Sequence, residues 1–433
     1  MVRIKTKAFI FLISSLILPI SFQLKSFAKE IRVGKGLNYS SITEALQNST
    51  EGDVIVVKDG VYNESIIINK RVRLIGENEP VIEGNYNGDV VRIEADKVLI
   101  KGFKIRKSGA NLLKDESGIK VVNSRGVIIE DNSLNDVLIG IYLYSSPGNE
   151  IRNNTSYGRA EYTTQETNGN GIHLWKSPNN KIEENYIINH RDGIYIEFSP
   201  GNVIRKNHCE RNVRYGLHFM YSDKNTFEGN IFERNGTGSA LMYSKNIVLR
   251  KNVFRLNLGL NGFGILLKSL SDSIAEENVI ADNTVGIFMD EANRNIFTRN
   301  NFLRNGWAID LFSSSTDNVF YANNFSDNNY QVMTDTDRSI NQFYKDYTGN
   351  YWSDYQGYNG YDLNADGIGD IPYKPVKLIS YLVKRYADLT VFLESPGFRA
   401  LEFAERVLPA LNPVELEDPY PLMNPIRIEK DSR

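Results

Sequence analysis

The segment RYGLHFMYS places His218 and Met220 two positions apart, so an imidazole and a thioether can be presented together. Side chains two residues apart on a β-strand point to the same face. Thioether and imidazole ligands suit Cu(I), and a neighbouring carboxylate would also tolerate Cu(II). Equivalent positions of neighbouring sequence repeats, described below, carry further ligands of these kinds. The candidate copper ligands are His173, Glu197, His218, Met220 and Met242.

Large aromatic residues at the same positions keep two other interpretations open. These residues are Tyr142, Tyr144, Trp175 and Tyr195. Together with the methionines and histidines, they could form an apolar surface that another domain or the C-terminal tail covers. They could also stack on the sugar rings of a polysaccharide, with Glu197 and Asp290 as acid and base.

A glycosidase that uses two carboxylates is disfavoured by the spacing of that pair. Glu197 and Asp290 lie several repeats apart, which corresponds to about 19 Å at the usual separation of β-strands. Two carboxylates that act on one glycosidic bond lie within about 10 Å of each other. A lyase, an epimerase or a noncatalytic glycan-binding protein remains the alternative to a copper-binding protein.

An acidic loop, DLNADGIGD, has the spacing of the front of an EF-hand calcium loop. Tyr373 occupies the twelfth position, where an EF-hand has Glu, and no helical pattern precedes the loop. Both a calcium-stabilised turn and a plain Asx-turn loop fit this pattern. The candidate calcium ligands are Asp362, Asn364, Asp366 and Asp370.

Glycine-led segments recur about every 22 residues through the middle of the chain. Examples are GIYLY, GIHLW, GIYIEF, GLHFMY, GILLKS and GIFMDE, and a second motif such as KNHC or KNVF keeps step with them. Each unit consists of short alternating runs separated by Asn, Asp, Gly and Ser, without helical periodicity. This pattern predicts an all-β fold, a parallel β-helix with one coil per repeat.

The alternation predicts which side chains face the interior. The inward columns contain Ile172, Ile194, Leu217, Ile265 and Ile287, and, two residues later, Leu174, Ile196, Phe219, Leu241, Leu267 and Met289. The first outward column contains Lys120, Tyr142, His173, Tyr195, His218, Ala240, Leu266, Phe288 and Asp310. The second outward column contains Val122, Tyr144, Trp175, Glu197, Met220, Met242, Lys268, Asp290 and Phe312. We expect the outward residues to face solvent.

Three polar or sulfur-bearing features are interpreted as structural. Asn185, Asn207, Asn230, Asn252 and Asn278 should stack as a hydrogen-bonded ladder at one corner of the coils. His190 and His208 fall outside both outward columns and are interpreted as structural or solvated. Cys209, the only cysteine, has no partner sulfur and is interpreted as a small buried hydrophobe rather than a metal ligand.

The two ends of the chain differ from the repeats. Arg3, Lys5 and Lys7 precede a short apolar run that ends in a small-residue site, which predicts an export signal cleaved near Ala28. Ser41 and Glu44 have capping-box spacing for a short helix, and Ser395-Pro396 is a plausible start of a second amphipathic helix in the tail. The predicted parts are residues 1–28, a signal peptide; 29–52, an N-terminal cap; 53–345, the β-helix; and 346–433, a loop followed by amphipathic helices.

The net charge of −3 gives no sign of the excess of Lys and Arg that proteins use to bind nucleic acid. The tail helices are either a C-terminal cap or a docking element for a partner. Docking is considered because capping alone rarely needs two amphipathic helices.

Several motifs, in order, resemble the NosD family of periplasmic copper-binding proteins. They include GNGIHLWKSPNN, RYGLHFMYS, NGWAIDLFS, NYWSDYQGYNGYDLNADGIGDIPYKPV and DPYPLM. The resemblance implies a right-handed parallel β-helix of the pectin-lyase-like type, with the sugar-hydrolase kind of repeat, and a non-enzymatic role. That role is to bind copper transiently in the periplasm and to help assemble the copper–sulfide centre of nitrous oxide reductase.

The resemblance also implies partners and a location. The partners are the membrane subunit and the ATPase of an ABC transporter, the apo-reductase and, at the donor end, a copper chaperone. The tail helices then become the expected dock for the membrane subunit, which would keep the protein near the membrane. The insertion GRAEYTTQETNGN, residues 158–170, is a local departure that could overhang the outward face.

Overall fold

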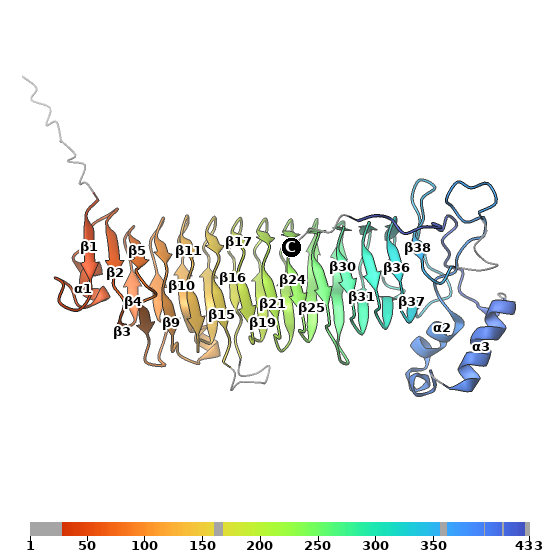
Figure 1. Cartoon of the computed structure of the whole chain (residues 1–433), viewed down its shortest axis with the longest axis horizontal. Coiled ribbons are helices and arrows are strands. Elements are labelled where there is room, and N and C mark those ends of the chain that lie inside the picture. Colours follow the sequence, from red (N-terminus) through yellow and green to blue (C-terminus); the bar gives the residue numbers. More distant parts are fainter. Residues whose placement is uncertain (1–27, 160–167, 356–361, 394, 409–410, 429–433) are drawn as a thin grey trace, which may run out of the picture.

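The computed structural model describes residues 28–159, 168–355, 362–393, 395–408 and 411–428. They form a long rod of stacked β-coils with a helical tail at one end (Figure 1). The predicted signal peptide and the middle of the insertion lie outside the described residues, so both stay predictions. In the described part, no helix combines the length and the apolar character needed to cross a membrane.

Three parallel sheets make up the rod in the part of the chain that is described. Sheet A has 13 strands: β1 (Glu30–Val33), β2 (Val54–Val57), β5 (Arg73–Gly76), β8 (Leu99–Lys101), β11 (Ile128–Glu130), β14 (Glu150–Arg152), β17 (Lys181–Glu183), β20 (Val203–Arg205), β23 (Thr226–Glu228), β26 (Val248–Arg250), β29 (Ile274–Glu276), β32 (Ile296–Thr298) and β35 (Val319–Tyr321). Sheet B has 13 strands: β3 (Val61–Asn63), β6 (Val81–Glu83), β9 (Lys104–Arg106), β12 (Ser133–Asn135), β15 (Thr155–Tyr157), β18 (Tyr186–Ile188), β21 (His208–Glu210), β24 (Ile231–Glu233), β27 (Val253–Arg255), β30 (Val279–Ala281), β33 (Asn301–Leu303), β36 (Asn324–Ser326) and β38 (Tyr351–Trp352). Sheet C has 12 strands: β4 (Ile66–Ile68), β7 (Val91–Ile93), β10 (Ser117–Val122), β13 (Ile139–Tyr144), β16 (Ile172–Trp175), β19 (Asp192–Glu197), β22 (Tyr215–Met220), β25 (Thr237–Lys245), β28 (Phe263–Ser271), β31 (Val285–Asp290), β34 (Trp307–Leu311) and β37 (Tyr330–Thr334).

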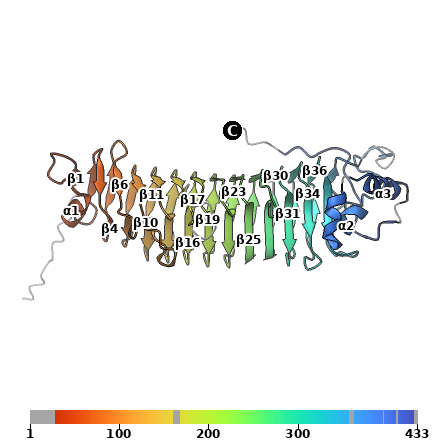
Figure 2. The same ribbon diagram turned by 90° about the horizontal axis from the view of Figure 1, so that it is seen from below.

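Consecutive strands of each sheet come from consecutive repeats, which confirms the expected parallel β-helix. The order of strands β13, β16, β19, β22 and β25 along sheet C follows the glycine-led segments of the sequence. A view turned by 90° shows the same rod, with β19 and β25 on one side and the tail at the end (Figure 2).

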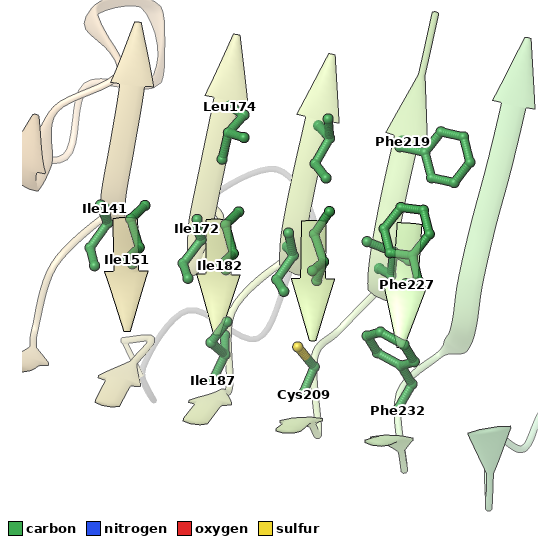
Figure 3. Close-up of a cluster of buried hydrophobic side chains, with 14 of the residues drawn as sticks. Ile141, Ile151, Ile172, Leu174, Ile182, Ile187, Cys209, Phe219, Phe227 and Phe232 are labelled. Carbon is green, nitrogen blue, oxygen red and sulfur yellow. The ribbon is translucent and has the colours of Figure 1, made fainter. Parts of the chain in front are cut away.

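The interior of the rod is a continuous apolar core, as the inward columns predict. Ile172 is paired in register with Ile194, Ile194 is paired with Leu217, and all three residues are buried. Figure 3 shows Leu174, Phe219 and their neighbours facing the interior, with the sulfur of Cys209 among the apolar side chains. Burial raises the pKa of the Cys209 thiol, so it stays protonated and packs as a hydrophobe.

Buried asparagines hold the corner between sheets A and B. Along the predicted ladder, the backbone N–H and side-chain amide of each residue donate to Oδ1 of the next, at 2.9 to 3.1 Å. Each amide also donates to a backbone carbonyl, as Asn230 does to Ile204 at 2.9 Å. The polar atoms of this corner are therefore satisfied without water, which fixes the coil-to-coil register.

The ends of the rod carry the helices. Helix α1 (Ile42–Gln47) follows the first strand, and Oγ of Ser41 accepts a hydrogen bond from the N–H of Glu44, as expected for its N-cap. The tail contains α2 (Leu378–Arg385), a 3₁₀ helix (Ala387–Phe392) and α3 (Pro396–Val407). Ser395 caps α3 through a hydrogen bond from the N–H of Phe398, which confirms the predicted start of that helix.

Several contacts fix the tail to the last coils. Nζ of Lys384, in α2, lies 2.7 and 2.8 Å from the two carboxylate oxygens of Asp310 in β34. It also lies 3.5 Å from the ring centroid of Phe312. Beyond α3 the chain turns back along sheet B, where the N–H of Ile426 donates to Oδ1 of Asn324 at 2.8 Å.

Candidate metal centre

Sheet C brings the predicted outward columns together in the expected register. In the first outward column, His173 is partnered with Tyr195, and Tyr195 with His218. In the second, Glu197 is partnered with Met220, and Met220 with Met242. Neighbouring strands lie about 4.8 Å apart, so the two thioethers start from adjacent backbone positions. Met220 is on the same strand and face as His218.

The outward residues are less exposed than the sequence predicts. His173 and His218 are only 7% and 5% exposed, and Tyr142 is 2% exposed. The physical reason is the short distance between coils, because the rings of Tyr142, His173, Tyr195 and His218 stack on one another and cover each other's faces. Met220, Met242 and Glu197 are half-buried. The expectation that these histidines face solvent was therefore wrong, although their outward direction is confirmed.

The two histidines belong to one stack of four aromatic rings. The ring centroids of Tyr142 and His173 are 4.5 Å apart, those of His173 and Tyr195 4.8 Å, and those of Tyr195 and His218 4.6 Å. The Tyr195 ring thus lies between the two imidazoles. A single ion cannot be bound by both histidines through that ring, so a ligand set that contains both would need two ions.

His218 is oriented by a buried carboxylate that the sequence patterns did not reveal. Nδ1 of His218 lies 3.3 Å from Oδ2 of Asp192, which is fully buried at the start of β19. Arg214 donates from Nε to Oδ1 of Asp192 at 2.8 Å and from Nη2 to Oδ2. Burial would raise the pKa of Asp192, but the hydrogen bonds from Arg214 and His218 outweigh it and hold that pKa at about 2.

The ionised Asp192 favours one tautomer of His218. Nη2 of Arg214 also lies 3.3 Å from Nδ1 of His218, but it is already bonded to Oδ2 of Asp192. A proton on Nδ1 can therefore be donated to the carboxylate, which leaves a lone pair on Nε2. Metal-binding histidines are commonly held in this way, with a carboxylate on the nitrogen that does not bind the metal.

His173 has the opposite environment. Neither of its ring nitrogens has a hydrogen-bond partner among the described residues. Burial first, and then the positive charge of Arg191, lowers its pKa to about 3. The imidazole is therefore neutral throughout the physiological range, with an unprotonated nitrogen available to a metal.

The predicted aromatic candidates are stacked on neighbouring rings, although Tyr144 is 36% exposed. Tyr144 stacks on Trp175 with centroids 4.7 Å apart, and Nζ of Lys176 lies 4.3 Å from the Trp175 ring. Tyr195 is stacked on both sides by histidines. Sugars bind aromatic residues through an open ring face, so this arrangement weighs against polysaccharide stacking.

Beside the methionines, a second aromatic stack is exposed. Phe198, Tyr221 and Tyr243 each follow a residue of the second outward column and are 44%, 46% and 37% exposed. Their centroids are 5.2 and 5.1 Å apart. All three have φ near +50°, a conformation that bulky residues rarely adopt. This stack is an exposed apolar surface directly after the second outward column in sequence.

The acidic loop is closed by its own backbone. The N–H groups of Asp366 and Gly367 donate to Asp362 at 3.1 and 2.8 Å, and the N–H of Leu363 donates to Asp370 at 2.7 Å. Asx turns also form within the loop, where the N–H of Asp366 donates to Oδ1 of Asn364 at 3.1 Å and the N–H of Ile368 donates to Oδ1 of Asp366 at 2.8 Å. The carboxylates are not gathered within 4.8 Å of one another, so calcium binding there stays a prediction.

The two histidines outside the outward columns have different surroundings. Nε2 of His190 lies 2.9 Å from Oγ of Ser156 in the interior, and burial lowers its pKa to about 3. His208 is half-buried on the outer face of sheet B, where its Nε2 lies 3.0 Å from Oε1 of Glu233.

Comparison with known proteins points to one family. Residues 156–357 match the family model described as periplasmic copper-binding protein (NosD). A protein of Stutzerimonas stutzeri, described as a probable ABC transporter binding protein NosD, is 29% identical, covering 84% of this chain and 85% of its own length. Its counterpart from Pseudomonas aeruginosa is 27% identical over 84% of this chain and 86% of its own length. These matches confirm the resemblance to NosD that the motifs indicated.

Solved structures share the fold. A mannuronic-acid-specific family 6 polysaccharide lyase from human gut microbiota matches with a TM-score of 0.54 and 15% identity, covering 88% of this chain and 100% of that one. The surface adhesin PfbA of Streptococcus pneumoniae matches with a TM-score of 0.53 and 14% identity, covering 68% and 88%. Together they confirm the pectin-lyase-like β-helix.

Proposed function

We infer that the chain belongs to the NosD family and propose that it receives Cu(I) in the periplasm and passes it on during assembly of the copper–sulfide centre of nitrous oxide reductase. The family is described as periplasmic and copper-binding, and the relatives are described as transporter binding proteins rather than as enzymes. Copper is then the cargo of this protein, and an ABC transporter is its partner.

The observation that carries the proposal is the combination of two methionines with an oriented histidine. Met220 and Met242 are partners on adjacent strands, and His218 precedes Met220 on the same face. Two thioethers and Nε2 of His218 form a soft donor set that suits Cu(I). Glu197, the other neighbour of Met220, supplies an oxygen at the edge of this set.

Partial burial of the ligands favours transfer over permanent storage. Met220 and Met242 are half-buried, and the stack formed by Phe198, Tyr221 and Tyr243, which follow the second outward column directly in sequence, is exposed. A copper donor protein could dock its own apolar surface on these rings and exchange ligands one at a time. His173, across the Tyr195 ring, offers a second neutral imidazole for an ion that is leaving or arriving.

The tail is proposed as the dock for the membrane subunit of the transporter. Apolar side chains of α3 and the residues after it are exposed, which include Phe403 at 69%, Val407 at 60% and Leu408 at 58%. Exposed apolar groups this close together commonly mark a binding surface. Copurification with the membrane subunit should be lost when Phe403 and Val407 are changed to Asp, and kept when the exposed Tyr347 is changed to Asp.

The copper site is tested by titrating Cu(I) into the exported protein in competition with a chromogenic Cu(I) chelator. Met220→Leu and Met242→Leu remove the sulfur while keeping the side-chain volume, and each should weaken binding by at least about tenfold, equivalent to 1.4 kcal/mol. Met289→Leu is the matched control, since Met289 is fully buried in the core of the same sheet. Equal affinity in all three variants would contradict the proposed site.

A further inference from the structure

The outer face of sheet B carries a second group of metal-binding side chains, separate from the copper candidates. His208 and Glu210 lie on β21 with the same outward direction, and Glu233 is the register partner of Glu210 on β24. One ligand atom of each residue lies within 4.8 Å of the other two. Among the described residues, this is the one group of three or more His, Cys, Asp or Glu side chains that meets that distance.

Each carboxylate is held through one oxygen and turns the other toward the imidazole. Oε2 of Glu233 accepts from Nε of Arg255 at 2.6 Å, while its Oε1 lies 3.0 Å from Nε2 of His208. Oε1 of Glu210 accepts from the hydroxyl of Tyr186 at 2.8 Å.

The other oxygen of Glu210 is the poorly satisfied atom of the group. Oε2 of Glu210 lies 3.8 Å from Nε2 of His208 and 4.0 Å from Nη1 of Arg234. Both separations are longer than a hydrogen bond, and no described residue makes one to this oxygen. Glu210 is only 9% exposed. This oxygen therefore keeps free lone pairs next to the imidazole, and a cation placed between the two groups could be bound by both.

The charges of the group favour a cation as well. Glu233 is 3% exposed, so two nearly buried carboxylates occupy adjacent coils and repel each other. The side chains of Arg234 and Arg255 are each 46% exposed, and ion pairs to such exposed groups compensate weakly. Burial would raise the pKa of Glu233, but hydrogen bonds from Arg255 and His208 outweigh it and lower that pKa.

We propose that His208, Glu210 and Glu233 bind one divalent cation of the Zn²⁺ class. Nε2 of His208 and one oxygen from each carboxylate would be the three protein ligands, and water would complete the coordination. Tyr186 and Arg255 would orient the carboxylates from behind. One nitrogen and two oxygens suit Zn²⁺ rather than Cu(I), so the two faces of the β-helix would bind metals of different softness.

The alternative is a network of hydrogen bonds and ion pairs at the same place without any metal, in which His208 and the neighbouring arginines satisfy the two carboxylates. The two cases differ in metal affinity, because such a network is complete without an ion, whereas the proposed site binds one.

The experiment is calorimetric titration of Zn²⁺ into copper-free exported protein at neutral pH, with Co²⁺ absorption as a spectroscopic check. One Zn²⁺ per chain is expected. His208→Gln and Glu210→Gln should each weaken binding by more than about tenfold, and Tyr186→Phe by about tenfold. Glu276→Gln is the control, because Glu276 pairs with Arg250 on the outside of sheet A without a histidine. Met220→Leu should leave Zn²⁺ affinity unchanged.

Thermal unfolding provides a second measurement in case a variant is less stable. Zn²⁺ should raise the unfolding temperature of the unmodified protein and of Glu276→Gln, but not that of Glu210→Gln. The proposal is overturned if the unmodified protein binds no Zn²⁺, or if His208→Gln and Glu210→Gln bind it as tightly as Glu276→Gln. A pentacoordinate or tetrahedral Co²⁺ spectrum that persists in His208→Gln would also overturn it.

Discussion

Nδ1 of His218 lies 3.3 Å from Oδ2 of Asp192, a carboxylate that is fully buried one coil away. This contact makes Asp192 a positioning residue for the proposed copper site, since it does not reach the cargo itself. It also explains why a histidine on the outside of a β-helix is nearly covered. The ring is held by a charge at one nitrogen and by Tyr195 on one face.

Asp192→Asn should weaken Cu(I) binding by about 10- to 100-fold, because the amide no longer holds the proton on Nδ1 of His218. The purified protein would be titrated against a Cu(I) chelator, and circular dichroism would verify the fold. Tyr215→Phe is a suitable control, since Tyr215 contacts the His218 ring only through its own ring, with the centroids 4.9 Å apart. A folded Asp192→Asn protein with full Cu(I) affinity would show that Asp192 only stabilises Arg214.

His173 should make the protein sensitive to acid. Its folded-state pKa is about 3, against about 6.5 in the unfolded chain, so only the unfolded chain takes up the proton between these values. The resulting stability is complete above pH 6.5 or so and is lost as the pH falls toward 3, to a total of roughly 5 kcal/mol.

His173→Phe keeps a ring between Tyr142 and Tyr195 but removes the titrating group. Denaturant unfolding at a series of pH values should therefore show a shallower fall in stability on acidification than in the unmodified protein. Tyr195→Phe alters the same stack without removing a group that titrates in this range, so its pH dependence should keep the original slope. Parallel curves for His173→Phe and the unmodified protein would argue against a neutral buried imidazole.

Lys384→Met should loosen the tail from the rod while leaving the coils folded. The variant keeps an apolar stem near Phe312 but leaves the buried Asp310 without its cation, and breaking a buried pair in this way destabilises by about 3–5 kcal/mol. Hydrogen exchange of α2 should speed up, with little change in sheet C. Arg385→Met, on an exposed side of the same helix, should exchange like the unmodified protein. Unchanged protection of α2 in Lys384→Met would show that other contacts hold the tail.

Asn230→Leu should strongly destabilise the β-helix. The buried side chain accepts from the N–H and the amide of Asn207 and donates to Ile204 and Asn252, and each unsatisfied group left behind costs about 1–3 kcal/mol. The loss would be measured by denaturant unfolding. Asn329→Ala, at an exposed position, should change stability by less than about 0.5 kcal/mol. Equal stabilities of the two variants would contradict a structural role for the ladder.

The fold and the register could be predicted from the sequence because the repeat carries both. The step between GIYIEF and GLHFMY aligns Ile194 with Leu217, and alternation then assigns every side chain to a face. The same reasoning found the partner of Met220 in Met242. Local hydrogen-bonding rules were sufficient for the Ser395 cap.

The burial of the outward residues could not be predicted. Alternation tells which face a side chain points to, but it does not tell which other side chains pack against it there. The position of Tyr195 between His173 and His218 depends on side-chain rotamers, and Asp192 precedes the glycine at which the motif was taken to begin. The contact between His208 and Glu233 was within reach, since KNHCE and GNIFE align once the second motif is followed like the first.

The first outward column contains both His218 and Asp310, the residue that anchors the tail. Each coil between them contributes a fixed rise of about 4.8 Å. If the tail rests on a transporter, the number of coils between the tail and the copper site sets the distance of Met220 and Met242 from the lipid. Removing or duplicating one whole coil between His218 and Asp310 would then change this distance by about 4.8 Å without altering any ligand.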